Sequence, residues 1–180
     1  MRPNLLLVLF CVLIATFSSF SNASSLTFSE VRHLLARTGF GVASPKEIEK
    51  FLSLSYEDAV DEILNGVREV SVQSAPVFKV NPLERRTVKD MDGSTRKAFN
   101  KRIKEDHYTL RNWWNREMLI TPSPFTERMV LFWHNHFVSE ASKVRFGKWL
   151  YDQNVTFRKH ATGDFRQLLT DISIGPAMLI

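Results

Sequence analysis

The chain has 180 residues, a formal net charge of +5 and a single cysteine, Cys11. Because this cysteine lies in an apolar N-terminal stretch, the remainder of the chain has no disulfide, no thiolate nucleophile and no cysteine metal ligand. The length normally supports one domain with its own hydrophobic core.

The N-terminal 23 residues are typical of a cleaved secretory signal. Arg2 gives a positive start, the segment from Leu5 to Phe17 is apolar, and Ser21-Asn22-Ala23 supplies the small residues that a signal peptidase reads. The apolar stretch is shorter than the ~20 residues that cross a bilayer. We therefore expect residues 1–23 to be a signal peptide. We expect residues 24–180 to be exported, to the periplasm or outside the cell, without a transmembrane anchor.

Three short helices are expected next, because helix start and stop signals follow one another closely. Thr27, Ser44 and Ser55 are typical N-cap residues, and Gly39 and Gly66 are typical stops. None of the three helices is long enough to be stable alone. They are therefore predicted to pack as helical hairpins.

The segment from Val67 to Pro82 has no helical period and contains two prolines, which favours an extended connection on the surface. After it, apolar residues at helical spacing predict a long helix from about Ser94 to Met118. Basic residues gather in the first half of this helix, and they are Arg96, Lys97, Lys101, Arg102 and Lys104. Export argues against nucleic acid as the partner. An anionic polysaccharide, lipid headgroups or a solvated helix face are the remaining explanations.

Three further helices complete the pattern. The expected ranges are Phe125 to Phe137, Phe146 to His160, and a helix capped by Asp164. The last of these is expected to bury Phe165 and Leu169. The fold class is therefore all-α, a multi-helix orthogonal bundle. Because the chain stops in an apolar run without a polar tail, we expect residues 24–180 to be the N-terminal portion of a larger helical domain.

The segment FTERMVLFWHNHF places His134 and His136 among aromatic residues. An unpartnered imidazole on an apolar face costs ~1–3 kcal/mol, so each ring needs a hydrogen-bond partner or a ligand. Residues two positions apart on a regular helix point about 200° from each other, so His134 and His136 cannot both bind one ion unless the helix unwinds between them. We expect His136 to face the core with Met129 and Trp133, and His134 to lie at the margin. A buried imidazole bonded to a backbone carbonyl is the simpler alternative.

A second inward histidine, His160, shares a predicted helix face with Gln153. Paired with His136, it would form an acid/base pair or half of a metal site, oriented by Glu127, Glu140 or Asp164. The candidate catalytic residues are thus His134, His136 and His160. The candidate substrate-binding residues are Trp133, Gln153 and Arg128. The sequence identifies no cofactor and does not settle whether a metal is bound.

Several motifs occur in an order that resembles the bacterial family called domain of unknown function 1800. They are Arg32 to Gly41, the Trp113-Trp114 pair before Met118-Leu119, Glu127 to Phe137, and Arg158 to Leu179. The resemblance implies an exported, mostly helical protein of greater length, associated with exported sulfatase-like proteins. This sequence departs from the family pattern at Gly175, where an aspartate is usual, and at Thr162-Gly163-Asp164, where Leu-Gly-Asn is more typical.

Two functions are consistent with these observations. One is a hydrolase-like enzyme acting on envelope or extracellular material through the inward histidines. The other is a non-catalytic binding or assembly protein that uses aromatic residues and the basic segment around Lys101 to hold an anionic polysaccharide or an envelope partner.

Overall fold

The computed structural model describes residues 24–41, 44–82 and 90–179. Its helices are α2 (Phe28–Thr38), α3 (Pro45–Leu52), α4 (Tyr56–Asn65), α5 (Gly93–Ile120), α6 (Pro124–His136), α7 (Gly147–Lys159) and α8 (Phe165–Ser173). Within the described residues the only β pairing is an isolated bridge between Ser25 and Ser55. The prediction of an all-α fold is confirmed. The predicted signal peptide lies outside the described residues.

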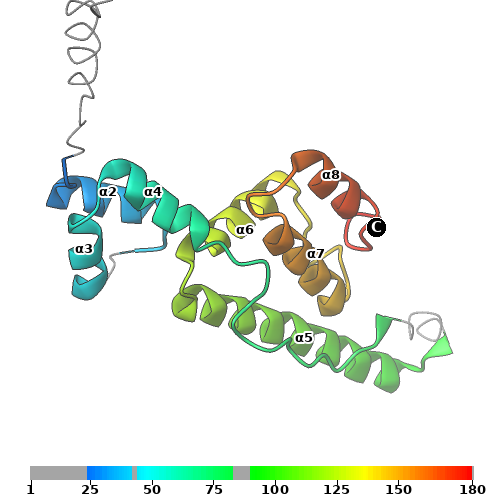
Figure 1. Ribbon diagram of the computed structural model, residues 1–180. Coiled ribbons are helices and arrows are strands. Elements are labelled where there is room, and N and C mark those ends of the chain that lie inside the picture. Colours follow the sequence, from blue (N-terminus) through cyan, green and yellow to red (C-terminus); the bar gives the residue numbers. More distant parts are fainter. Residues whose placement is uncertain (1–23, 42–43, 83–89, 180) are drawn as a thin grey trace, which may run out of the picture.

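Helices α2, α3 and α4 form a group at one end of the molecule (Figure 1). Each begins as predicted, because the side chains of Thr27, Ser44 and Ser55 accept hydrogen bonds from backbone amides in the first turn. The group shares one apolar core. Its buried members are Leu26, Val31, Leu35, Phe51 and Ala59.

Helix α5 runs along the lower edge of the molecule in Figure 1, beneath α6 and α7. It begins at Asp92, whose side chain accepts from the amides of Ser94 and Thr95, and it ends before Pro122. Its buried residues include two carboxylates, Asp106 and Glu117. The buried face of α5 is therefore not purely apolar.

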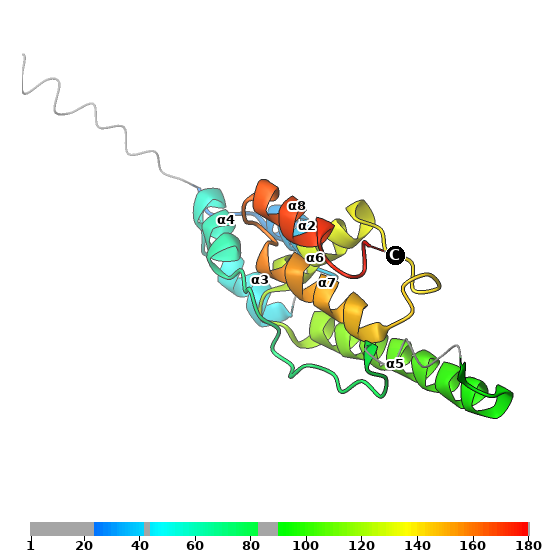
Figure 2. The same ribbon diagram turned by 90° about the vertical axis from the view of Figure 1, so that its right-hand side faces the viewer.

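Helix α7 packs against α5, α6 and α8 (Figure 2). The core between α6, α7 and α8 contains Val130, Phe157, Leu168 and Ile172. Phe165 and Leu169 of α8 were expected to be buried, and this expectation is wrong, since they are 49% and 43% exposed. The short helix buries only a narrow stripe against its neighbours.

The connection between α4 and α5 is more than a surface linker. It runs beside α5 in both ribbon views, and its Val80 is 3% exposed. The start of α7 approaches it closely. A Cβ atom on Gly147 would lie 3.1 Å from Cε1 of Phe78 and 3.3 Å from Cβ of Asp106. Any side chain at position 147 would therefore crowd Phe78 and Asp106 and make them shift.

Candidate functional site

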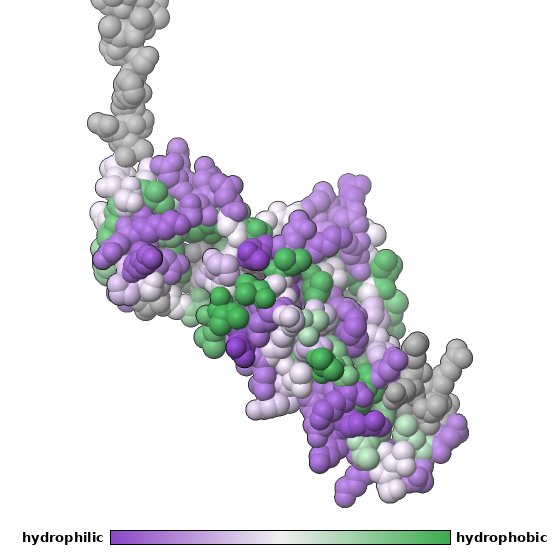
Figure 3. All heavy atoms as spheres, turned by 60° about the horizontal axis from the view of Figure 1, so that its bottom comes forward, coloured by the Kyte–Doolittle hydropathy of each residue, from purple (hydrophilic) through white to green (hydrophobic). Residues whose placement is uncertain are grey.

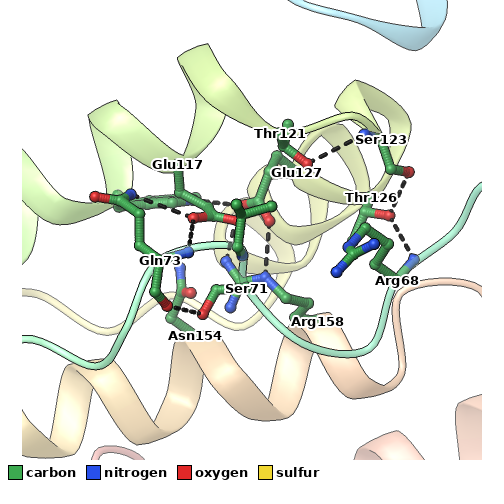
Figure 4. Close-up of polar contacts among 12 residues, drawn as sticks. Arg68, Ser71, Gln73, Glu117, Thr121, Ser123, Thr126, Glu127, Asn154 and Arg158 are labelled. Atoms are coloured by element: carbon green, nitrogen blue, oxygen red, sulfur yellow. Dashed lines mark hydrogen bonds and ion pairs between the residues drawn. The ribbon is translucent and has the colours of Figure 1, made fainter.

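A buried ion pair lies between α6 and α7. Glu127 receives two hydrogen bonds from Arg158, of 2.7 and 2.9 Å, and each side chain is 1% exposed. Trp114 of α5 donates its indole N–H to the same carboxylate at 2.8 Å. The Arg158 guanidinium carbon lies 5.5 Å from the centre of the Trp113 ring. One charged pair thus links all three helices (Figure 4).

A second buried carboxylate, Glu117, binds the connection that precedes α5. Its oxygens accept from the backbone amides of Val72 and Gln73, at 2.6 and 3.0 Å, and from the Gln73 side chain at 3.2 Å. Figure 4 shows Gln73 lying against Glu117. Trp113 donates its indole N–H to the Ser74 carbonyl at 2.9 Å. This half of the connection is therefore held by side chains of α5.

Asp106 holds the other half in the same way. Its two oxygens accept from the amides of Lys79 and Val80, at 2.8 and 3.0 Å. Asp106 and Glu117 lie 11 residues apart, about three turns, so both face the connection. We call residues Val67–Asn81 the strap. Since buried amides need acceptors, these two carboxylates replace the ladder partners that an isolated extended segment lacks.

His134 faces the interior of this polar region. Its ring lies 4.7 Å from the Trp114 ring and 4.7 Å from the Phe157 ring. Its Nε2 atom is 3.2 Å from the Asn154 amide nitrogen. Burial, together with the nearby charge of Arg158, lowers the pKa of His134 to about 4. At neutral pH the ring is uncharged and is a weak base.

Helix α7 also contributes three buried polar atoms without a hydrogen-bond partner. They are Oε1 of Gln153, Oδ1 of Asn154 and Nη1 of Arg158. Gln153 uses its other end, donating to Ser139 Oγ at 2.8 Å. This part of the interior therefore has hydrogen-bonding capacity that the packing of the described residues does not use.

The prediction that His136 faces the core is wrong, because His136 is exposed. His134 is half-buried. The buried residues of α6 are Thr126, Glu127 and Val130, so its inward face includes polar residues. Met129 and Trp133, which were expected to face the core, are half-buried like His134. Charged partners on α7 set the rotation of α6.

His136 belongs to an aromatic cluster on the surface. Its ring lies 6.4 Å from Phe132 and 6.0 Å from Trp133. Trp133 packs against Phe165 at 5.8 Å and donates its indole N–H to the Ala161 carbonyl at 3.3 Å. Trp133 and His136 are thus brought together, but no contact joins His136 to His160 within the described residues.

His160 is buried, as expected, and it is 7% exposed. The carboxylate that contacts its Nε2 atom, at 2.8 Å, belongs to Asp171 of α8. It is none of the three acids that the sequence suggested. Glu127 pairs with Arg158, and Asp164 caps α8. The hydrogen bond from His160, followed by that from Gln167, lowers the pKa of Asp171.

The remaining predicted site residue, Arg128, lies apart from these groups. It is exposed, and its guanidinium carbon sits 5.9 Å from the centre of the Phe40 ring. The six candidate residues therefore occupy several environments. Their catalytic and substrate-binding roles stay predictions.

A groove of about 400 Å³ lies where α2–α4 meet the junction of α5 and α6. Figure 3 shows hydrophobic residues gathered on the surface where the N-terminal helices meet the rest of the molecule. The groove contains none of the six predicted site residues. It is separate from the polar interior around Arg158.

Within the described ranges, no three His, Cys, Asp or Glu residues come together in a way that would hold a metal ion. None of the described helices combines the length and the apolar character needed to span a membrane.

Asp106 and Glu117 were not among the residues predicted from the sequence. A signal for them was present, because Phe99, Asp106, Trp113 and Glu117 fall on one stripe of α5 at spacings of seven, seven and four residues. Acidic residues on such a stripe need partners from elsewhere in the chain. The sequence does not name those partners.

The fold and these polar contacts define an all-α protein with a charged, hydrogen-bonded interior. Residues 33–180 match the family model described as "Protein of unknown function (DUF1800)", and the chain belongs to this family. Comparisons with curated proteins and with solved structures gave no match.

Proposed function

We propose that this protein is exported and binds an anionic polysaccharide through the N-terminal half of α5. The observation that supports the proposal is the charge of this half-helix. Between residues 93 and 104 there is no acidic residue, and the basic side chains are all exposed. They are Arg96, Lys97, Lys101, Arg102 and Lys104.

The basic surface extends beyond the helix. Arg102 and Arg145 lie 5.8 and 5.4 Å from the centre of the Phe99 ring, and Arg145 also donates to Asn100. From residue 96 to residue 104 the charges extend about 12 Å along the helix axis. A polymer with acidic groups at intervals matches this length better than a single small anion does.

The test is binding of the full chain to polygalacturonate, with dextran as the neutral polymer. A triple variant, Lys97→Ala, Lys101→Ala and Lys104→Ala, should weaken binding to polygalacturonate at least tenfold. A matched control, Arg32→Ala, Arg37→Ala and Lys46→Ala, removes three exposed charges from the N-terminal helices. Binding should also weaken as salt rises, because exposed charges are screened. Equal losses in both triple variants, or equal binding of dextran, would contradict the proposal.

A second candidate, a hydrolase acting on envelope or extracellular material, is favoured by one observation. The Asp171 carboxylate contacts Nε2 of His160, an arrangement that orients an imidazole as a general base. The assay is release of reducing ends from polygalacturonate. Activity in the native chain that is lost in His160→Gln but kept in His33→Gln would support this candidate, and no release by the native chain would remove it.

A further inference from the structure

We propose that the groove between α2–α4 and the α5–α6 junction binds an amphiphilic amine, that is, a molecule with an apolar body and one protonated amino group. The volume of about 400 Å³ lies within the range of small-ligand pockets, roughly 300–1,000 Å³. The site does not involve the basic half of α5, so this inference is independent of polysaccharide binding.

The walls of the groove are mainly apolar and come from both sides of the junction. The N-terminal helices and their loop contribute Leu35, Phe40, Phe51 and Ile63, and the α5–α6 side contributes Met118, Leu119, Pro122, Pro124 and Phe125. Leu119 is 85% exposed and Phe40 is 40% exposed. Large apolar side chains gathered around a concave surface favour an apolar ligand.

Most polar groups of the groove already have partners. The Thr38 hydroxyl donates to the Leu34 carbonyl at 2.8 Å, and Ser44 Oγ accepts from the Glu47 amide at 3.3 Å. Lys50 forms an ion pair with Glu62. Each of these groups therefore already makes a contact within the chain.

The Glu47 carboxylate is different. It lines the groove, is half-buried, and accepts no hydrogen bond from the part of the chain that the structure describes. Arg128 lies over the Phe40 ring, and among the described residues it forms no ion pair with Glu47. The Phe51 ring similarly has Lys50 at 6.0 Å. A carboxylate without a partner among the described residues, in a groove also lined by the Phe40 and Phe51 rings, complements a positive charge and repels a negative one.

The experiment compares three probes that share one tail, which are octylammonium, octanol and octanoate, by calorimetry with the full chain at pH 7.5. We expect octylammonium to bind about fivefold more tightly than octanol, the scale of one partly exposed charge pair. Octanoate should bind most weakly. Glu47→Gln should remove the preference for the amine and leave octanol unchanged.

A second variant tests whether the groove is the site. Gly41 lines the groove, and a Cβ atom there would meet no heavy atom within 4 Å, so Gly41→Phe adds a bulky side chain at a position where a side chain can begin. Gly93→Phe is the control, because a Cβ atom there is equally free but lies outside the groove. Gly41→Phe should reduce binding of octylammonium at least tenfold, with an unchanged circular dichroism spectrum.

Three results would overturn the proposal. They are the absence of binding by octylammonium, octanoate binding as tightly as octylammonium, and unchanged affinity in folded Gly41→Phe. Because polygalacturonate binding is measured separately, these results would leave the proposed function untouched.

Discussion

Glu127 and Arg158 meet in a two-point ion pair with 1% of each side chain exposed, and Trp114 donates to the same carboxylate. Such a pair adds little net stability, because removing both charges from water costs about as much as their attraction returns. Its effect is on geometry. The pair fixes the rotation of α6 relative to α7, and it thereby turns His134 inward.

Removal of one member should be far more damaging than removal of both. Glu127→Ala leaves a buried guanidinium without its counter-charge and should lower the free energy of unfolding by about 3–5 kcal/mol. The double variant Glu127→Leu, Arg158→Leu should lose less than the single variant. Urea unfolding followed by circular dichroism measures both. A single variant within 1 kcal/mol of the native protein would contradict this prediction.

The stability of the protein should fall between pH 6.5 and pH 5 because of His134. The pKa of this ring is about 4 when folded, against an ordinary value of 6.5. As pH decreases, the unfolded chain therefore takes up a proton first. The stabilisation that comes from keeping His134 neutral is fully present above about pH 6.5 and is lost as pH falls toward 4. By pH 5 the loss in unfolding free energy amounts to about 2 kcal/mol.

The comparison for this prediction is His134→Gln, in which the same fall in pH should cost less. His33→Gln, an exposed histidine of α2, should keep the native pH dependence. An equal slope of unfolding free energy against pH in the native protein and His134→Gln would rule out His134 as the cause.

The two carboxylates of α5 should protect different amides of the strap from hydrogen exchange. Glu117→Gln should speed exchange at Val72 and Gln73, and Asp106→Asn should speed exchange at Lys79 and Val80. Each variant serves as the control for the other. Exchange that rises throughout the strap in both variants would show instead that it opens as a single unit.

The close approach at Gly147 predicts a cost for a single methyl group. Gly147→Ala should lower stability by about 1–3 kcal/mol through overcrowding against Phe78 and Asp106. Gly93→Ala, in the first turn of α5 with open space around it, should be neutral or slightly stabilising. The two thermal midpoints should therefore shift in different directions or by clearly different amounts.

The helix starts were predictable because capping is local. Thr27, Ser44, Ser55 and Asp164 each bond to an amide three residues ahead, so both partners appear in one short stretch of sequence. Ser123 is the residue before α6. Its hydroxyl, however, makes no cap bond and pairs with Thr126 instead.

Which face of a helix is buried was less predictable, because the sequence offers only hydropathy to choose between faces. In α6, Met129 and Trp133 are more apolar than Glu127, yet Glu127 is buried and the other two are half-buried. The reason is a partner on another helix, Arg158, which lies 31 residues away from Glu127 in the sequence. No pattern within α6 contains that information.

The strap shows the same limit over longer separations. The amides that bind Glu117 lie 45 and 44 residues before it. His160 was correctly placed inward, but its carboxylate came from the neighbouring helix, 11 residues on. The burial of His160 could be inferred from the spacing of residues along its helix. Its hydrogen-bond partner could not, because that depends on how the helices cross.

The direction of synthesis gives the strap a further consequence. Its amides precede α5 in the chain, so they are synthesised before Asp106 and Glu117, the acids that accept from them. A fragment that began at Gly93 would contain both acids and none of those donors. Any minimal unit excised from the C-terminal helices must therefore retain residues from Val67 onward, or replace both acids with neutral side chains.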